Sequence, residues 1–114
     1  MKVGLLSPAT SAFDAFRRSR ERFFPEGPGC YVLTTFDGDV LYIGLATNLK
    51  RRLLQHLDNP QKTELTPKGR AVLVHWRPDH NLFLEKLERT WLLIHEQHEG
   101  KLPMLNRMHS PVSV

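Results

Sequence analysis

The dipeptide Asp37-Gly38 constrains the fold of this chain more than any other feature, because it separates two runs rich in β-branched and aromatic residues. Asp-Gly in this position is a strong hairpin signal, since a type I′ turn requires positive φ at both central residues. The pattern therefore predicts an antiparallel hairpin formed by residues 29–36 and 39–44.

The register of this hairpin decides where its two tyrosines point. A two-residue turn pairs Leu33 with Tyr42 and Tyr31 with Gly44, and side chains alternate along each strand. Tyr31 and Tyr42 are then diagonal neighbours on one face, with Cα atoms roughly 7–8 Å apart. A three-residue turn without a bulge would place the two rings on opposite faces. Cys30 is expected on the other face, as a small buried apolar residue.

A helix is predicted over residues 49–57, directly after the hairpin, with Thr47 or Asn48 as its N-cap. Because successive residues are about 100° apart on a helix, Arg52 and His56 fall on the same side as the apolar anchors. These two side chains are therefore expected to face either the edge of the core or a ligand. The face itself is made of Leu49, Arg52, Leu53 and His56, whereas Lys50 and Arg51 point elsewhere.

Four further segments can be assigned. Residues 7–24 predict an amphipathic helix, residues 58–69 a surface loop, residues 70–77 a third strand and residues 80–99 a long helix. The apolar stripe of the first helix would contain Phe13, Phe16, Phe23 and Phe24, with Arg17, Arg18, Arg20 and Arg22 mostly off it.

Glu88 is an unusual residue of the predicted long helix, because it lies on the shoulder of the apolar stripe. A carboxylate in that position costs free energy unless a cation or a donor meets it. Spacing alone leaves two partners open, an arginine and a divalent metal ion. The stripe consists of Leu84, Leu87, Trp91 and Ile94.

Composition sets the broad class. The chain has 114 residues, which is most simply one domain, and a net charge of +4. Residues 45–77 hold seven Lys and Arg against two acids, whereas residues 78–99 hold five acids against two bases. This bias favours a polyanionic partner, with an ordinary solvated charge pattern as the alternative. The single cysteine excludes an internal disulfide, and no apolar run reaches membrane length, so we expect a cytoplasmic protein.

Five short motifs follow one another in a fixed order, and together this order resembles the GIY-YIG nuclease family. The resemblance covers about residues 28–107. The motifs are Gly29-Cys30-Tyr31, Tyr42-Ile43-Gly44, Asn48 to Arg52 followed by His56, Glu88, and Pro103-Met104-Leu105-Asn106.

The expected fold is therefore α+β. It has a β-β-α-β-α core with a small, three-stranded, mainly antiparallel sheet flanked by helices, plus an extra N-terminal helix. The expected organisation is an N-terminal helical extension over residues 1–27, a nuclease-like domain over residues 28–107 and a tail over residues 108–114. The chain has no room for an appended DNA-binding domain, so sequence specificity is expected to be low, or to be supplied by a partner, by dimerisation or by DNA shape.

The resemblance implies a metal-dependent endonuclease that hydrolyses phosphodiester bonds in DNA. In that reading a tyrosine deprotonates the attacking water, and the favoured assignment is Tyr31 as the base with Tyr42 assisting. The other implied site residues are Glu88 as the ligand of one Mg²⁺ or Mn²⁺, Arg52 at the scissile phosphate, His56 orienting a tyrosine or contacting phosphate, and Asn106 docking the C-terminal segment.

DNA is the expected partner, and neither a homodimer nor a larger complex is excluded. Two alternatives stay open: a nucleic-acid-binding module without catalysis, and a subunit of a repair, recombination or defence complex that is inactive alone. For such a subunit the phenylalanine stripe at Phe13, Phe16 and Phe23 would be the docking surface. The residues expected to contact nucleic acid are Lys50, Arg51, Lys62, Lys68 and Arg70.

Overall fold

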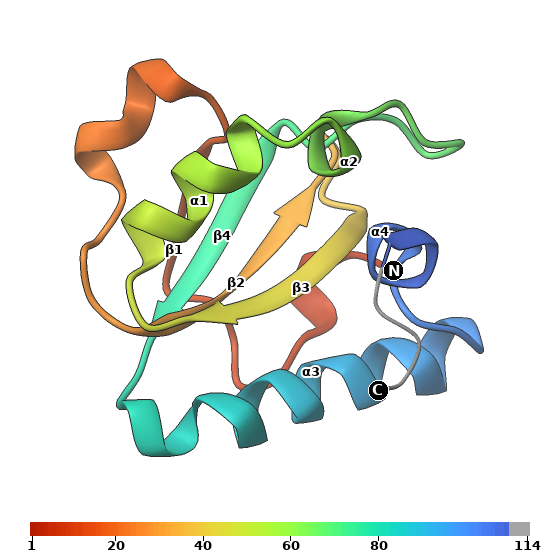
Figure 1. Cartoon of the computed structure of the whole chain (residues 1–114). Coiled ribbons are helices and arrows are strands. Elements are labelled where there is room, and N and C mark those ends of the chain that lie inside the picture. The colour runs from red at the N-terminus through yellow and green to blue at the C-terminus, as the bar shows by residue number, and fades with distance from the viewer. Residues whose placement is uncertain (110–114) are drawn as a thin grey trace.

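The computed structural model describes the backbone of residues 1–109 and the side chains of residues 1–106. It confirms the α+β class: an antiparallel sheet in the order β1-β4-β2-β3 lies between α1 on one face and α3 on the other (Figure 1). The sheet has four strands instead of the expected three. The elements are η1 (Val3–Leu5), β1 (Ala12–Ala15), η2 (Arg18–Phe23), β2 (Gly29–Thr34), β3 (Val40–Ala46), α1 (Leu49–Leu57), α2 (Pro60–Thr63), β4 (Leu73–Pro78), η3 (Asn81–Phe83), α3 (Leu84–Glu99) and α4 (Met104–His109).

The predicted register of the hairpin is confirmed, although its turn is of another kind. Leu33 pairs with Tyr42 and Tyr31 with Gly44, as expected. The turn, however, is closed by a hydrogen bond from the Gly38 N–H to the Thr35 carbonyl oxygen, and Gly38 alone supplies the positive φ, 87°. It is thus a three-residue connection, and a bulge next to Leu33 restores the register that a two-residue turn would have given.

Side chains that alternate along β2 build two separate cores. Tyr31 and Leu33 point to the face covered by α1, where Leu49 and Leu53 meet them. The intervening residues point to the face covered by α3, and Cys30 is fully buried there, as predicted. The second core contains Cys30, Val32, Ile43, Leu84, Leu87 and Trp91.

The helix predicted over residues 49–57 is observed with those bounds. Asn48 is its N-cap, and the Asn48 side chain accepts a hydrogen bond from the Arg51 N–H at 3.0 Å. Leu49, Leu53 and His56 are buried as expected, whereas Arg52 is exposed at the edge of this face. The third strand and the long helix are also present, although residues 81–83 form a 3-10 turn before α3 begins.

The prediction of an N-terminal helix over residues 7–24 is wrong. Residues 12–15 instead form β1, which pairs with β4 and extends the sheet by one strand, and residues 18–23 form the 3-10 segment η2. Pairing with the free edge of β4 satisfies the backbone groups of this segment within the sheet. The expected phenylalanine stripe is therefore divided: Phe16 is buried, whereas Phe13 is exposed and stacks on His75.

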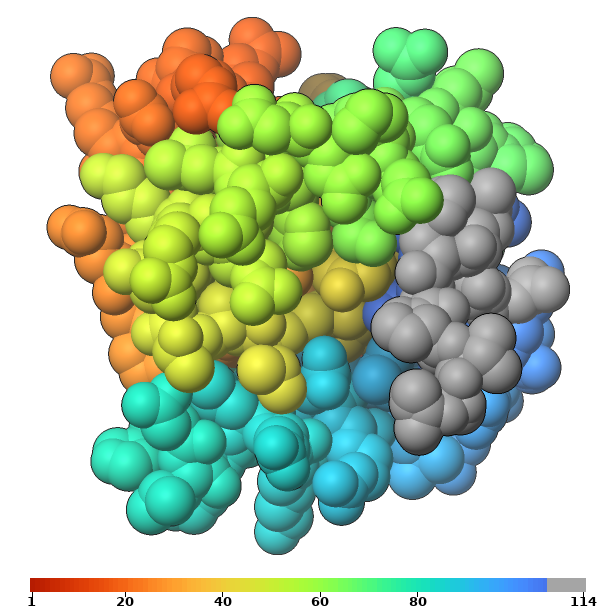
Figure 2. Space-filling view, viewed as in Figure 1, coloured from red at the N-terminus to blue at the C-terminus, as the bar shows by residue number. Residues whose placement is uncertain are grey.

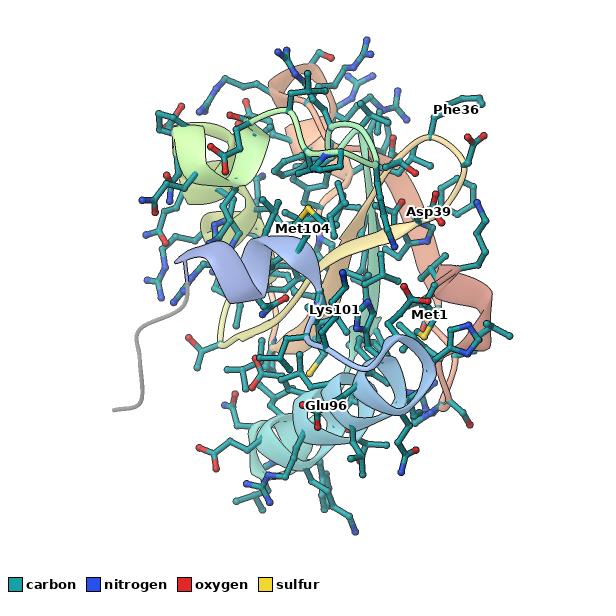
Figure 3. All side chains as sticks on the ribbon, turned by 90° about the vertical axis from the view of Figure 1, so that its right-hand side faces the viewer. Met1, Phe36, Asp39, Glu96, Lys101 and Met104 are labelled. Atoms are coloured by element: carbon teal, nitrogen blue, oxygen red, sulfur yellow. The ribbon has the colours of Figure 1, made fainter. Side chains whose placement is uncertain are left out.

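Two further segments differ from expectation. The predicted loop over residues 58–69 contains the short helix α2, and residues 104–109 form α4. Figure 3 shows Lys101 in the segment that links α3 to α4 and Met104 at the start of α4, beside β3. Of the predicted tail, residues 110–114 lie outside the described residues. Among the helices that are described, none is long and apolar enough to cross a membrane.

Candidate active site

Both tyrosines and the histidine predicted for the site lie together on the α1 side of the hairpin. The Tyr31 hydroxyl is hydrogen-bonded to His56 Nε2 at 2.5 Å, and the Tyr31 and Tyr42 side chains lie close enough for each to shift the pKa of the other. The centroids of the two phenol rings are 6.0 Å apart, and the His56 ring lies 5.5 Å from Tyr31 and 5.4 Å from Tyr42. The three rings therefore form one contiguous cluster.

The glycines of the two motifs have different structural reasons. A Cβ atom on Gly44 would lie 2.6 Å from the Tyr31 hydroxyl oxygen, so the tyrosine occupies the space in which a side chain would stand. A Cβ atom on Gly29 would lie 2.7 Å from the Arg77 carbonyl oxygen and 2.7 Å from Leu49. Gly44 thus makes room for the site itself, whereas Gly29 lets β2 pass close to β4 and α1.

His56 is a neutral imidazole at physiological pH. Burial, together with the positive charges of Lys62 and Arg52, lowers the pKa of His56 to about 4. Because the ring is neutral, one of its nitrogens carries a lone pair, and Nε2 can accept a proton from the Tyr31 hydroxyl. The site therefore contains a proton acceptor in contact with a phenol.

Both phenols are protonated in the same pH range. Burial raises the pKa of Tyr31 well above its ordinary value, and the neighbouring Tyr42 raises it further, whereas Arg52 lowers it. Burial is also the main reason why the pKa of Tyr42 is raised, and the negative charge of Glu88 is the second. Neither side chain is a preformed phenolate, so any proton that one of them accepts must be passed on.

Glu88 and Arg52 act on this cluster from two helices on opposite faces of the sheet. β3 is an edge strand, and α3 packs against it. Figure 2 shows β3 at the surface between α1 and α2 on one side and α3 on the other. The charges of Glu88 and Arg52 both influence the pKa values of Tyr31 and Tyr42. Both charges therefore lie near enough to the phenols to change their pKa values, and the edge strand β3, which carries Tyr42, lies between the two helices.

Within the described part of the chain, neither Arg52 nor Glu88 has an ion-pair partner. Arg52 is exposed, and among the described residues no carboxylate lies within ion-pair distance of it. Glu88 is half-buried; burial raises its pKa, and the neighbouring Glu85 raises it further. The sequence left two partners open for Glu88, an arginine and a divalent metal ion. No arginine pairs with Glu88 in the part of the chain that is described, which favours the metal ion.

Asn106 fixes α4 to the same strand edge. Its side-chain Oδ1 accepts a hydrogen bond from the Ile43 N–H at 3.0 Å, and its Nδ2 donates to the Ile43 carbonyl oxygen at 3.0 Å. The amide thus takes the place of a neighbouring strand for the residue between Tyr42 and Gly44. This is a docking contact, as expected for Asn106, and it steadies the backbone that carries Tyr42.

Lys62 is the residue whose position sequence reasoning missed. It was expected in a surface loop at the nucleic acid, but its side chain is buried and its Nζ lies 4.4 Å from the centroid of the Tyr42 ring. The local signal was Asn59-Pro60, which begins α2 with a capping hydrogen bond from the Gln61 N–H to Asn59 Oδ1 at 2.9 Å. That pair predicts a short helix, but it does not predict where the helix packs.

The other residues expected to contact nucleic acid lie at the surface and outside this cluster. Lys50 and Arg51 lie on α1, half-buried and exposed respectively, and Arg70 is exposed. Lys68 Nζ is paired with Glu99 Oε1 at 3.3 Å. Lys50, Arg51 and Arg70 thus remain accessible to a polyanion, whereas the charge of Lys68 is partly neutralised.

The donor set at this edge suits a hard cation with a largely aqueous shell. Among the described residues no group of three or more His, Cys, Asp or Glu side chains could enclose a metal ion. Among the described residues, Glu88 is the carboxylate whose charge raises the pKa of both phenols, and Mg²⁺ is commonly held by one or two carboxylates, with water and substrate phosphate completing its shell. The residues present therefore fit one hydrated Mg²⁺ or Mn²⁺ and do not fit a fully protein-bound metal.

Comparison with known proteins agrees with the geometry. The sequence matches the GIY-YIG catalytic domain over residues 27–100, most of the chain. UvrABC system protein C of Mesoplasma florum is 33% identical over 72 residues, which cover 63% of this chain and 11% of that protein. The protein of the same name from Hydrogenobaculum sp. is 29% identical over 89 residues, covering 76% and 13%. That of Methanospirillum hungatei is 43% identical over 44 residues, covering 39% and 8%.

The matched region thus corresponds to roughly a tenth of the length of these relatives. The family match covers both tyrosine motifs, the helix with Arg52 and His56, and Glu88. The chain therefore belongs to the GIY-YIG nuclease family.

Proposed function

We propose that this protein is a metal-dependent endonuclease that hydrolyses phosphodiester bonds in DNA, with one divalent cation at Glu88 and a tyrosine as general base. One observation supports the proposal: two phenols and a neutral imidazole lie in contact beside β3, and the charges of Arg52 and Glu88 are near enough to shift the pKa values of both phenols. Phosphodiester hydrolysis requires a proton acceptor, positive charge at the phosphate oxygens and stabilisation of the departing oxygen.

The path of the proton follows from the burial of the two rings. Tyr31 is 1% exposed and is bonded to His56, whereas Tyr42 is only partly buried, so an attacking water meets Tyr42 first. The water proton passes to the Tyr42 oxygen, the Tyr42 proton to the Tyr31 oxygen, and the Tyr31 proton to His56 Nε2. This order makes Tyr42 the base and Tyr31 the relay, the reverse of the assignment favoured from the sequence.

Such a relay avoids a free phenolate, which is important because the pKa values of both tyrosines are raised. Protons move in a concerted step from water to the imidazole, and each phenol is neutral before and after it. His56 then becomes an imidazolium beside Lys62 and Arg52, and it returns its proton to solvent or to the departing oxygen. The lowered pKa of His56 favours that release.

The charged groups stabilise what forms at the phosphate. Arg52 is exposed and free of an ion pair among the described residues, and its planar guanidinium matches two phosphate oxygens. When bound at Glu88, a divalent cation supplies positive charge to the departing oxygen and offsets the carboxylate charge that raises the pKa of the phenols. Lys50 and Arg51 on α1 provide further positive charge for the backbone of the bound strand.

The test uses the purified chain with single-stranded, duplex and branched DNA of one sequence, each with Mg²⁺, Mn²⁺ or EDTA. Cleavage that needs the metal is expected, and Glu88→Gln and Arg52→Gln should each lower the cleavage rate by about 10²–10³-fold. Glu96→Gln is the matched control, because Glu96 is an exposed carboxylate on the same helix (Figure 3).

The base is assigned by comparing Tyr42→Phe with Tyr31→Phe. Both are expected to be strongly impaired, and only Tyr31→Phe should recover partly at high pH, because the base at Tyr42 remains present. If the chain binds DNA but does not cleave it with any metal or at any pH, it is a binding module and not an enzyme. If cleavage appears only after a second protein is added, the chain is a subunit of a complex that is inactive alone.

A further inference from the structure

Lys62 is a buried lysine inside the site. Its side chain is 8% exposed, although lysine is almost never fully buried unless it is paired. Its Nζ lies 4.4 Å from the centroid of the Tyr42 ring, over the face of the ring, which is the geometry of a cation–π contact. The ammonium thus lies over the ring of a side chain that the proposed function makes catalytic.

The backbone around Lys62 is fixed, so this position is not an accident of a flexible side chain. The Lys62 N–H donates to the Asn59 carbonyl oxygen at 2.9 Å, and Asn59 also caps α2 through its side chain. Pro60 occupies the first turn of α2, and the helix packs against α1 and α4. Because α4 is itself attached to β3 by Asn106, the position of Lys62 is coupled to the edge of the sheet.

We propose that Lys62 is a positioning residue of the site, whose ammonium holds the Tyr42 ring against His56 and keeps a positive charge beside the imidazole. This inference rests on the proposed function of Tyr42 and His56, and it differs from the phosphate contact that the sequence suggests for Lys62. A phosphate ligand should present its cation to solvent, as Arg51 does on α1.

The charge of Lys62 has a defined effect on proton transfer. Among the described residues, the titratable and charged groups around His56 are Tyr31 on β2, Tyr42 on β3, Arg52 on α1 and Lys62 on α2. Burial lowers the pKa of Lys62, whereas Glu64 raises it. A cation at this position opposes protonation of His56 before the reaction, so the imidazole stays ready to accept the Tyr31 proton.

The experiment compares Lys62→Met, which keeps the apolar stem and removes the charge, with Lys62→Arg, which keeps the charge. Lys86→Met on α3 is the control for loss of a lysine outside the cluster. The pKa of the His56 imidazole is measured by NMR in the full chain, and the pH profile of kcat and the KM for DNA are measured in parallel.

Lys62→Met should raise the pKa of His56 by about one unit and lower kcat at unchanged KM, with the acidic limb of the kcat profile shifted to higher pH. Lys62→Arg should stay close to the wild type in both respects. An unchanged His56 titration in Lys62→Met overturns the inference. A higher KM with unchanged kcat and His56 titration also overturns it and makes Lys62 a DNA contact.

A second measurement does not depend on a folded variant. In the wild-type protein the ε-methylene protons of Lys62 should be shifted upfield by the Tyr42 ring, and unshifted resonances would contradict the cation–π contact. Absence of cleavage by the wild type would overturn the proposed function, whereas the His56 titration and the ring-current shift still decide the position of Lys62.

Discussion

Replacing Gly44 with alanine tests the geometry of the site most directly. The added Cβ would lie 2.6 Å from the Tyr31 hydroxyl oxygen, 2.7 Å from its Cζ and 2.9 Å from Cε2 of Tyr42. Ordinary van der Waals contact begins at 3.4 Å, so the hydroxyl must move by about 0.8 Å. The ring has no free space for this movement, because Tyr31 is 1% exposed and bonded to His56 at 2.5 Å.

Overpacking of this kind typically costs about 1–3 kcal/mol of stability. The alanine variant also gains about 0.4–1 kcal/mol, because its unfolded chain has less conformational freedom. Gly44→Ala should therefore be destabilised by about 1–2 kcal/mol, which lowers Tm by about 4–8 °C in a chain of this size. Displacement of a catalytic group by nearly 1 Å should reduce the cleavage rate by about 10²-fold.

Thermal unfolding followed by circular dichroism, together with the DNA cleavage assay, measures both effects. Gly27→Ala is the matched control, because nothing lies within 4 Å of a Cβ at that position. It should be as stable as the wild type, or slightly more stable, and fully active. If Gly44→Ala keeps both the Tm and the cleavage rate of the wild type, Tyr31 does not lie where its hydroxyl excludes a side chain, and the reasoning fails.

Three further predictions concern the same cluster. Asn106→Ala should lower the free energy of unfolding in urea by about 1–3 kcal/mol, because the buried N–H and carbonyl of Ile43 lose their partner; a loss below 0.5 kcal/mol contradicts this. The chain has only two tyrosines, Tyr31 and Tyr42, so absorbance at 295 nm follows them alone, and no phenol should titrate with the ordinary midpoint near pH 10. His56 has a pKa of about 4 in the folded chain and about 6.5 when unfolded. The neutral imidazole therefore contributes at most about 3 kcal/mol to the free energy of unfolding; this contribution is complete above pH 6.5 and is lost as pH falls toward 4. Urea unfolding of the wild type and of His56→Gln between pH 4 and 7.5 measures it, and stabilities that depend on pH in the same way in both proteins would refute it.

The sequence predicted those parts of the structure that depend on local patterns. Alternation along the two hairpin runs predicted that Tyr31 and Tyr42 share a face, and the helical spacing of residues 49–57 placed His56 among the apolar anchors. The type of turn could not be predicted, because a three-residue turn with a bulge gives the same register as a two-residue turn without one. Either turn would therefore place the two tyrosines in the same way.

The N-terminal segment shows where local patterns fail. Residues 12–15 have no strong strand signal, and the spacing of Phe13 and Phe16 also fits a helix. The edge of β4 lies sixty residues further along the chain, and its unpaired backbone groups decided that this segment is a strand. No window of sequence contains that information.

The sequence by itself determined the chemical groups of the site, their order and the faces on which the hairpin and α1 present them. Only the tertiary structure decided that the charge of Glu88 acts on the phenols, that Asn106 occupies the outer side of β3, and that Lys62 lies over the Tyr42 ring. The physical reason is that these three contacts join elements far apart in the chain. Periodicity fixes the direction of a side chain only relative to its own helix or strand, whereas packing of whole elements fixes which side chains meet.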